Sequence, residues 1–285
     1  MRILVTGADG FTGLHFVALA RTLGHEVFEF TANLTDPVAV KAQVAMAAPE
    51  AVVHLAAISF VGHSHASAFY DVNVIGTLHL LDALKELKHT PSRVLLASSA
   101  NVYGNCEQSP ISETQLPAPV NHYAMSKLAM EYLAKNYQTQ LPLFFVRPFN
   151  YTGVGQALSF VVPKIVTHFK KLAPSIELGN LHVEREYNDV RAVCDIYMRL
   201  LMSAHAGETY NICSGQTYTL QHIIAALTEL TGHSLQVNVN PAFVRANEIH
   251  RLCGNPEKLV NAIGSLPSYA IKDTLKAMLA AASAT

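Results

Sequence analysis

Short apolar runs with little polar alternation recur along the first half of the chain. They occupy residues 3–5, 51–57 and 93–97. Runs of this length are typical of strands buried on both faces of a parallel sheet. Between and after them, apolar side chains recur at helical intervals over residues 11–23, 71–87 and 123–139. This alternation predicts an α/β fold with a doubly wound parallel sheet.

A glycine-rich turn follows the first of these strands. Gly7, Gly10 and Gly13 lie three residues apart, between the strand at 3–5 and the helix that begins at Phe11. Glycine permits a tight turn and a close approach of backbone amides to a ligand, and the helix N-terminus offers free N–H groups to phosphate. The order strand, glycine turn, helix therefore predicts a dinucleotide site.

The next predicted strand, at residues 25–30, ends where such a fold contacts the adenosine ribose. An acidic residue there would accept a hydrogen bond from the ribose 2′-hydroxyl and would repel a 2′-phosphate. Thr31 stands at this position, which favours NADP(H) and permits NAD(H). Asn33 and Leu34 are placed to border the adenine.

A strand-end serine and a tyrosine–lysine pair supply candidate chemistry. Ser99 follows the strand at 93–97, at the sheet edge where open α/β folds bind ligands. Tyr123 and Lys127 are four residues apart in a predicted helix, so their side chains share a face. A neighbouring ammonium lowers the pKa of a phenol from about 10, which would make Tyr123 a general acid or base. Asn73 is expected to brace the active-site strand.

Composition excludes several other classes of function. The 285 residues contain 20 Lys and Arg against 21 Asp and Glu, so neither a nucleic-acid footprint nor a polybasic membrane anchor is indicated. No apolar run is long enough to span a bilayer and the first strand begins at residue 2, so a cytoplasmic location is expected. The four cysteines are scattered without a C-x-x-C pair, and no metal site is expected.

Five motifs in order resemble the extended short-chain dehydrogenases/reductases that act on nucleotide sugars. They are the glycine turn at 6–13, HLAA at 54–57, SSANVYG at 98–104, YAMSK at 123–127 and RPFN at 147–150. The resemblance implies a catalytic set in which Ser99 hydrogen-bonds the sugar oxygen, Tyr123 exchanges a proton with it, and Lys127 holds the nicotinamide ribose. Cofactor contacts are then expected from Gly7, Gly10, Phe11, Thr12, Gly13, Thr31, Asn33, Leu34, Leu55, Ala56, Ala57, Asn73, Ala97, Tyr123, Lys127 and Pro148.

Later segments resemble the branch that contains GDP-mannose dehydratases and GDP-4-keto-6-deoxy-mannose reductases. They lie at residues 147–156, 160–166, 177–181, 185–190 and 240–256. Arginines in them can neutralise a diphosphate, and a carboxylate can accept from ribose hydroxyls or a purine. Substrate contacts are expected from Ser99, Asn101, Asn150, Arg185, Arg245 and Glu248, and a GDP-linked sugar is favoured.

The residues after Ser99 separate the reactions within this branch. Relatives that remove water from the sugar carry a carboxylate there, because abstraction of a proton from carbon needs a further base. This chain has Ala100 and Asn101 instead, which favours hydride transfer without dehydration. The leading hypothesis is an NAD(P)H-dependent reductase of a nucleotide-linked 4-keto-6-deoxy sugar. A nucleotide-sugar epimerase that retains NAD(P) and a non-catalytic NADP-binding sensor are the alternatives.

The resemblance also implies the domain organisation. Residues 1–150 are expected to form the NAD(P)-binding Rossmann domain, to which a strand near 209–213 returns. Residues 151–285 are expected to form mainly the sugar-nucleotide-binding lobe. A homodimer is expected from the family, with the helices at 71–87 and 123–139 available to pair across a twofold axis.

Overall fold

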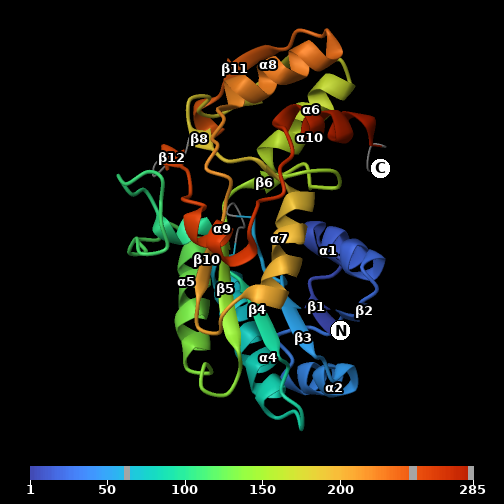
Figure 1. The fold of residues 1–285 in the computed structure, drawn as a ribbon. Coiled ribbons are helices and arrows are strands. Elements are labelled where there is room, and N and C mark those ends of the chain that lie inside the picture. The colour runs from blue at the N-terminus through green and yellow to red at the C-terminus, as the bar shows by residue number, and fades with distance from the viewer. Residues whose placement is uncertain (61–64, 244–248, 282–285) are drawn as a thin grey trace.

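The computed structural model describes residues 1–60, 65–243 and 249–281. A six-stranded sheet with the order β10-β5-β4-β3-β1-β2 forms its larger part (Figure 1). All five neighbouring pairs are parallel, and register places Thr6 of β1 between Phe30 of β2 and His54 of β3. The strands are β1 (Arg2–Thr6), β2 (Glu26–Phe30), β3 (Ala51–His54), β4 (Arg93–Ala97), β5 (Leu143–Pro148) and β10 (Thr209–Ile212). The doubly wound α/β fold predicted from the sequence is confirmed.

Helices cover both faces of this sheet, and each face has its own apolar core. One face packs against α1 (Phe11–Thr22), α7 (Val190–Ser203) and α9 (Glu257–Ile263). The other packs against α2 (Pro37–Ala47), α4 (Gly76–Lys85) and α5 (His122–Lys135). Side chains alternate between the two faces along each strand: Ile3 and Val5 belong to the first core, and Leu4 belongs to the second.

Strand β1 lies at the point where the chain changes direction across the sheet. It pairs with β2 on one side and with β3 on the other. Ligands of open α/β sheets bind beyond the carboxyl ends of the strands at such a switch point. The turn after β1 therefore stands where a ligand of such a sheet is expected.

The predicted helix over 71–87 is interrupted in the structure. A short α3 (Ala66–Tyr70) leads into a π-helical turn η1 (Asp71–Ile75), and α4 follows. The Thr77 hydroxyl donates to the carbonyl of Asn73 at 2.8 Å, and the Asn73 side chain reaches out to other segments. These bonds stabilise the wider turn, a feature often found at functional sites. Helix α5 likewise ends at Lys135, before the predicted 139.

The smaller lobe has a separate core made by α6 (Val161–Lys170), α8 (Leu220–Thr231) and α10 (Ile271–Ala280). In the part of this lobe that the structure describes, the strands form three short pairs. The remaining elements are β6 (Tyr151–Thr152), β7 (Ser175–Leu178), β8 (Glu184–Arg185), β9 (Asn188–Asp189), β11 (Gln236–Val239), β12 (Arg251–Leu252) and the 3₁₀ turns η2 (Ala100–Tyr103) and η3 (Pro241–Phe243). Helices α7 and α9 and strand β10 return to the large sheet, and the division at residue 150 stays a prediction.

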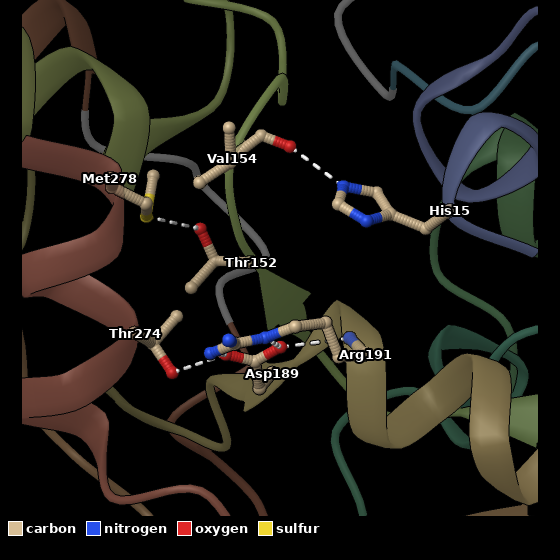
Figure 2. A network of polar contacts seen from close by, with 7 residues as sticks. All are labelled: His15, Thr152, Val154, Asp189, Arg191, Thr274 and Met278. Carbon is tan, nitrogen blue, oxygen red and sulfur yellow. Dashed lines mark hydrogen bonds and ion pairs between the residues drawn. The ribbon is translucent and has the colours of Figure 1, made fainter. Parts of the chain in front are cut away.

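A polar network joins the two lobes (Figure 2). His15 of α1 hydrogen-bonds the carbonyl of Val154, in the segment that leaves the sheet, at 2.8 Å. Asp189 caps α7 through the N–H of Arg191 and accepts a 2.7 Å hydrogen bond from Thr274 of α10. Helices α1 and α10 are thereby fixed to the same junction between the lobes. Among the residues that the structure describes, no helix is long and apolar enough to cross a membrane.

Candidate active site

The turn after β1 has no room for a side chain at Gly7 or at Gly13. Gly7 has a φ of +67°, and a Cβ there would lie 2.8 Å from the backbone nitrogen of Ala56. A Cβ on Gly13 would lie 2.0 Å from the Gly7 carbonyl oxygen, so the helix and the turn touch through bare backbone. Gly10 is the N-cap of α1 and brings no side chain over the helix N-terminus. These features fit the phosphates of a dinucleotide.

Tyr151 packs against the same turn, and the sequence did not single it out. Its ring stacks on Phe11 with centroids 5.9 Å apart and an interplanar angle of 13°. Its hydroxyl lies 2.7 Å from that of Thr12. Tyr151 directly follows the RPFN motif, but nothing in the spacing indicates that it would fold back over residues 139 positions earlier. Phe11 and Thr12 therefore lie at the turn as expected, with their side chains engaged by Tyr151.

Thr31 lies at the end of β2, as predicted, where a neutral side chain from α2 holds it. Gln43 Nε2 donates to the Thr31 hydroxyl at 2.7 Å. Asn33, expected at the adenine, bonds its own loop by accepting from the Thr35 N–H and hydroxyl. Leu34 is buried in the core and packs against Gly76. The adenine contacts of Asn33 and Leu34 stay predictions.

Residues after β3 are tied to both the nucleotide turn and the catalytic helix. The N–H of Ala56 donates to the Thr6 hydroxyl at 3.2 Å, and Leu55 packs partly into the α1 face of the core. Ala57 follows at the half-buried start of the loop. Asn73 accepts from the Ile58 N–H at 2.9 Å and donates to the Ser126 hydroxyl at 3.0 Å. Asn73 thus braces this loop against α5; these bonds go to a loop and a helix, and its expected contacts with the active-site strand and the cofactor stay predictions.

Ser99, Tyr123 and Lys127 come together at the carboxyl end of β4, and all three side chains are buried. The backbone N–H of Asn101 and its side-chain amide both donate to Ser99 Oγ, at 3.2 and 3.3 Å. Ser99 is also hydrogen-bonded to the Tyr123 hydroxyl. Lys127 Nζ donates to the carbonyl of Ala97 at 2.7 Å. The hydroxyl pair and the ammonium meet at the sheet edge where ligands bind.

Burial controls the proton affinities of this set. It raises the pKa of Tyr123 above 10, and the hydrogen bond with Ser99 opposes that rise. Burial lowers the pKa of Lys127 to about 8, opposed by the negative charge of Glu131. The expected lowering of the Tyr123 pKa by Lys127 is therefore not found in this structure. A phenol that stays protonated at neutral pH is suited to donate a proton.

A buried ion pair stands one helical turn behind Lys127. Arg147 of β5 donates to both oxygens of Glu131, at 2.9 and 2.6 Å, and to the Tyr103 hydroxyl at 3.0 Å. Tyr103 in turn donates to Asn211 of β10 at 2.7 Å. The network ties α5, the turn after Ser99 and the neighbouring strands β5 and β10 together. Sequence inspection missed it because Glu131 lies in the helix while its partners lie in other elements.

Fewer of the predicted substrate residues can be placed. Asn150 is exposed beyond Pro148, the last residue of β5, and its carbonyl accepts from the Asn188 N–H. Arg185 lies on β8 and donates to the carbonyl of Glu184 at 2.9 Å. Arg245 and Glu248 lie outside the described residues. The structure thus gathers the proposed catalytic set and the nucleotide turn, and leaves the diphosphate contacts as predictions.

The buried carboxylate of Glu186, next to Arg185 in the chain, was not predicted. It accepts from the backbone N–H groups of Ser214 and Gly254, at 2.7 and 2.8 Å, and from the side chain of Asn188. Burial raises its pKa, and these donors oppose the rise. Glu186 therefore joins β9, the segment after β10 and the segment after β12.

Comparison with known proteins identifies the family to which this chain belongs. Residues 25–278 match the family model of GDP-mannose 4,6 dehydratase, and this chain belongs to that family. It is 40% identical to GDP-6-deoxy-D-talose 4-dehydrogenase of Aggregatibacter actinomycetemcomitans, over 93% of this chain and 92% of the relative. It is 33% identical to GDP-6-deoxy-D-mannose reductase of Pseudomonas aeruginosa, over 98% of this chain and 96% of the relative. The family and branch predicted from the sequence are confirmed.

Solved structures agree with this membership. RMD from Pseudomonas aeruginosa, complexed with NADPH, superposes with a TM-score of 0.91 at 31% identity over 98% of each chain. UDP-glucose 4-epimerase of Thermus thermophilus, in complex with NAD, gives a TM-score of 0.89 at 26% identity, over 99% of this chain and all of the other. The fold thus occurs with either dinucleotide.

Proposed function

We propose that this chain is an NAD(P)H-dependent reductase that delivers hydride to the 4-keto group of GDP-4-keto-6-deoxy-mannose. The names of the two relatives support this substrate. 6-Deoxytalose and 6-deoxymannose differ only in configuration at C4, so oxidation of either at C4 gives the same 4-ketone. A 4-dehydrogenase of one sugar nucleotide and a reductase that yields the other therefore share one keto sugar.

The observation that supports the proposal most directly is that the side chains of Ser99, Tyr123 and Lys127 lie together and are buried. Bound NAD(P)H supplies the hydride. The Tyr123 hydroxyl, kept protonated by burial, gives its proton to the oxygen that forms at C4. Ser99, already bonded to Tyr123, hydrogen-bonds the same oxygen, and the Lys127 ammonium stabilises developing negative charge nearby. Asn101 fixes the Ser99 hydroxyl through its backbone and side-chain donors.

The same corner of the site disfavours dehydration. Removal of water from the sugar requires a base to take a proton from carbon, and a carboxylate after the strand-end serine would supply it. Asn101 stands there and uses its amide to donate to Ser99. A neutral amide does not act as this base, so the protein is not expected to remove water from the sugar.

The test is to incubate the protein with GDP-4-keto-6-deoxy-mannose and NADPH, then to follow absorbance at 340 nm and identify the sugar by NMR. The proposal predicts one NADPH consumed per ketone and a GDP-6-deoxyhexose as product. An epimerase would convert a sugar nucleotide without net change at 340 nm. A protein that binds NADPH but neither reduces keto sugar nucleotides nor interconverts sugar nucleotides would contradict both enzymatic hypotheses.

We also propose that the protein is a homodimer in the cytoplasm. Neighbouring helices α4 and α5 leave large apolar side chains in solvent: Met125 and Tyr132 on α5 are 41% and 59% exposed, and Ile75 just before α4 is 42% exposed. Such side chains can pair with a second copy across a twofold axis. Sedimentation equilibrium tests the proposal: a dimer is expected, and Tyr132→Glu should favour the monomer.

A further inference from the structure

The ribose end of the crevice contains a contact that the proposed chemistry does not use. The N–H groups of Thr31 and Ala32, directly after β2, both donate to Gln43 Oε1, at 3.0 and 2.9 Å. Gln43 Nε2 donates to the Thr31 hydroxyl at 2.7 Å. Because only oxygen can accept from two N–H groups, this network fixes the orientation of the amide.

Two consecutive N–H groups that converge on one oxygen form an arrangement suited to an anion. Such backbone nests bind phosphate and carboxylate oxygens in many proteins. Here the nest lies at the end of β2, where a fold of this class places the adenosine ribose and any 2′-phosphate. A neutral carboxamide from α2 occupies it.

The charged side chains around this nest are engaged elsewhere. Glu29 of β2 pairs with Arg21 at 2.7 Å, and Asp36 caps α2 through the N–H groups of Val38 and Ala39. Lys41, on the same helix as Gln43, pairs with Glu86 at 2.6 Å. The contact between Gln43 and the end of β2 is therefore one between neutral groups.

We propose that Gln43 determines how the protein discriminates between NADPH and NADH, by occupying the backbone N–H groups that would otherwise bind a 2′-phosphate oxygen. The inference rests on the proposed function, since it needs the dinucleotide to bind with its ribose at β2. A neutral occupant of the nest neither repels a 2′-phosphate nor lets the nest bind it. The protein is then expected to accept both cofactors.

Two variants at this position change the preference in opposite directions. Gln43→Glu keeps an acceptor of the same shape and adds a negative charge beside the 2′-phosphate, so the ratio of Kd for NADPH to Kd for NADH should rise about tenfold or more. Gln43→Ala frees both N–H groups, and the same ratio should fall about threefold or more. Fluorescence titration of the two reduced cofactors, without sugar substrate, gives both constants.

Gln221→Glu is the matched control, because Gln221 is an exposed glutamine on α8 and its replacement adds the same charge. It should leave the ratio unchanged. Thermal unfolding with 2′,5′-ADP and with 5′-AMP provides a second readout: Gln43→Glu should lose the stabilisation by 2′,5′-ADP and keep that by 5′-AMP.

Failures of the two proposals can be told apart. If the parent binds both cofactors and Gln43→Glu leaves the ratio within twofold of the parent value, this inference is wrong and the proposed function stands. If the parent binds neither cofactor, the proposed function fails as well. A folded Gln43→Ala variant whose ratio rises rather than falls also contradicts the inference.

Discussion

The two ends of the crevice are built in different ways. At the end near Tyr123, the polar side chains are buried, Lys127 donates to the Ala97 carbonyl, and the buried Glu131–Arg147 ion pair stands one helical turn behind them. At the end near Thr31, the contacts are exposed or half-buried and join neutral groups within two neighbouring elements. Changes at the first end should therefore affect reaction and fold together, whereas changes at the second should affect only which cofactor binds.

The largest effect is expected for Tyr123→Phe. Loss of the hydroxyl removes the proposed proton donor, and kcat should fall by a factor of about 10² to 10⁴. The Kd for NADPH should change less than about threefold, because the ring remains. Tyr132→Phe, at an exposed tyrosine of the same helix, is the control and should leave kcat unchanged. Near-parental turnover by Tyr123→Phe would contradict the assignment of Tyr123 as the proton donor.

The next largest effect concerns the buried ion pair. Arg147→Met leaves Glu131 as an unpaired charge in the core and should lower the free energy of unfolding by about 3–5 kcal/mol, measured by urea denaturation. The double variant Arg147→Met/Glu131→Leu should recover most of that loss. Lys272→Met breaks an exposed pair with Glu229 and should cost less than about 1 kcal/mol. A double variant as unstable as the single one would show that the unpaired charge is not the cause.

A smaller effect, on the pH dependence of the free energy of unfolding, is expected from His54, the last residue of β3. Its ring nitrogens bond the hydroxyls of Thr6 and Thr77, and burial, with a further contribution from the positive charge of Lys127, lowers its pKa to about 3. A depressed histidine pKa stabilises the fold above the unfolded pKa of about 6.5, and that stability is lost as pH falls from 6.5 toward 3. The free energy of unfolding should fall by about 2 kcal/mol between pH 7.5 and pH 5.

His54→Gln should flatten this part of the pH dependence, as measured by urea denaturation at several pH values. His89→Gln, at an exposed loop position, should leave it as in the parent. If His54→Gln loses as much stability as the parent between pH 7.5 and pH 5, the buried neutral histidine is not responsible.

The smallest effect is expected at Tyr151, which packs on the glycine turn. Tyr151→Phe removes the hydroxyl bonded to Thr12 and keeps the ring on Phe11. This bond orders the turn expected to hold the phosphates, and one hydrogen bond is worth about 1 kcal/mol, so the Kd values of NADPH and NADH should rise together by at most about fivefold. A change in the ratio of the two constants would show that selectivity is not confined to the Thr31 end.

The sequence predicted the parts of this site that depend on local spacing. The glycine turn after β1 and the Tyr123–Lys127 pair follow from residues three or four apart. Gln43, Tyr151 and the Glu131–Arg147 pair were not predicted, because each contacts a partner in another element and its residue type has no distinctive local pattern. The interrupted helix at 71–75 was missed for a related reason: Asn73 and Thr77 form bonds that periodicity does not encode.

The central claim is that hydride passes from the reduced nicotinamide to C4 of the sugar. NADPH carrying two deuterium atoms at the nicotinamide C4 tests it directly, with GDP-4-keto-6-deoxy-mannose as acceptor and NMR of the isolated sugar nucleotide as readout. The account predicts one deuterium at C4 of the product and none at its neighbours. A product without deuterium at C4, or with label at another carbon, would contradict it.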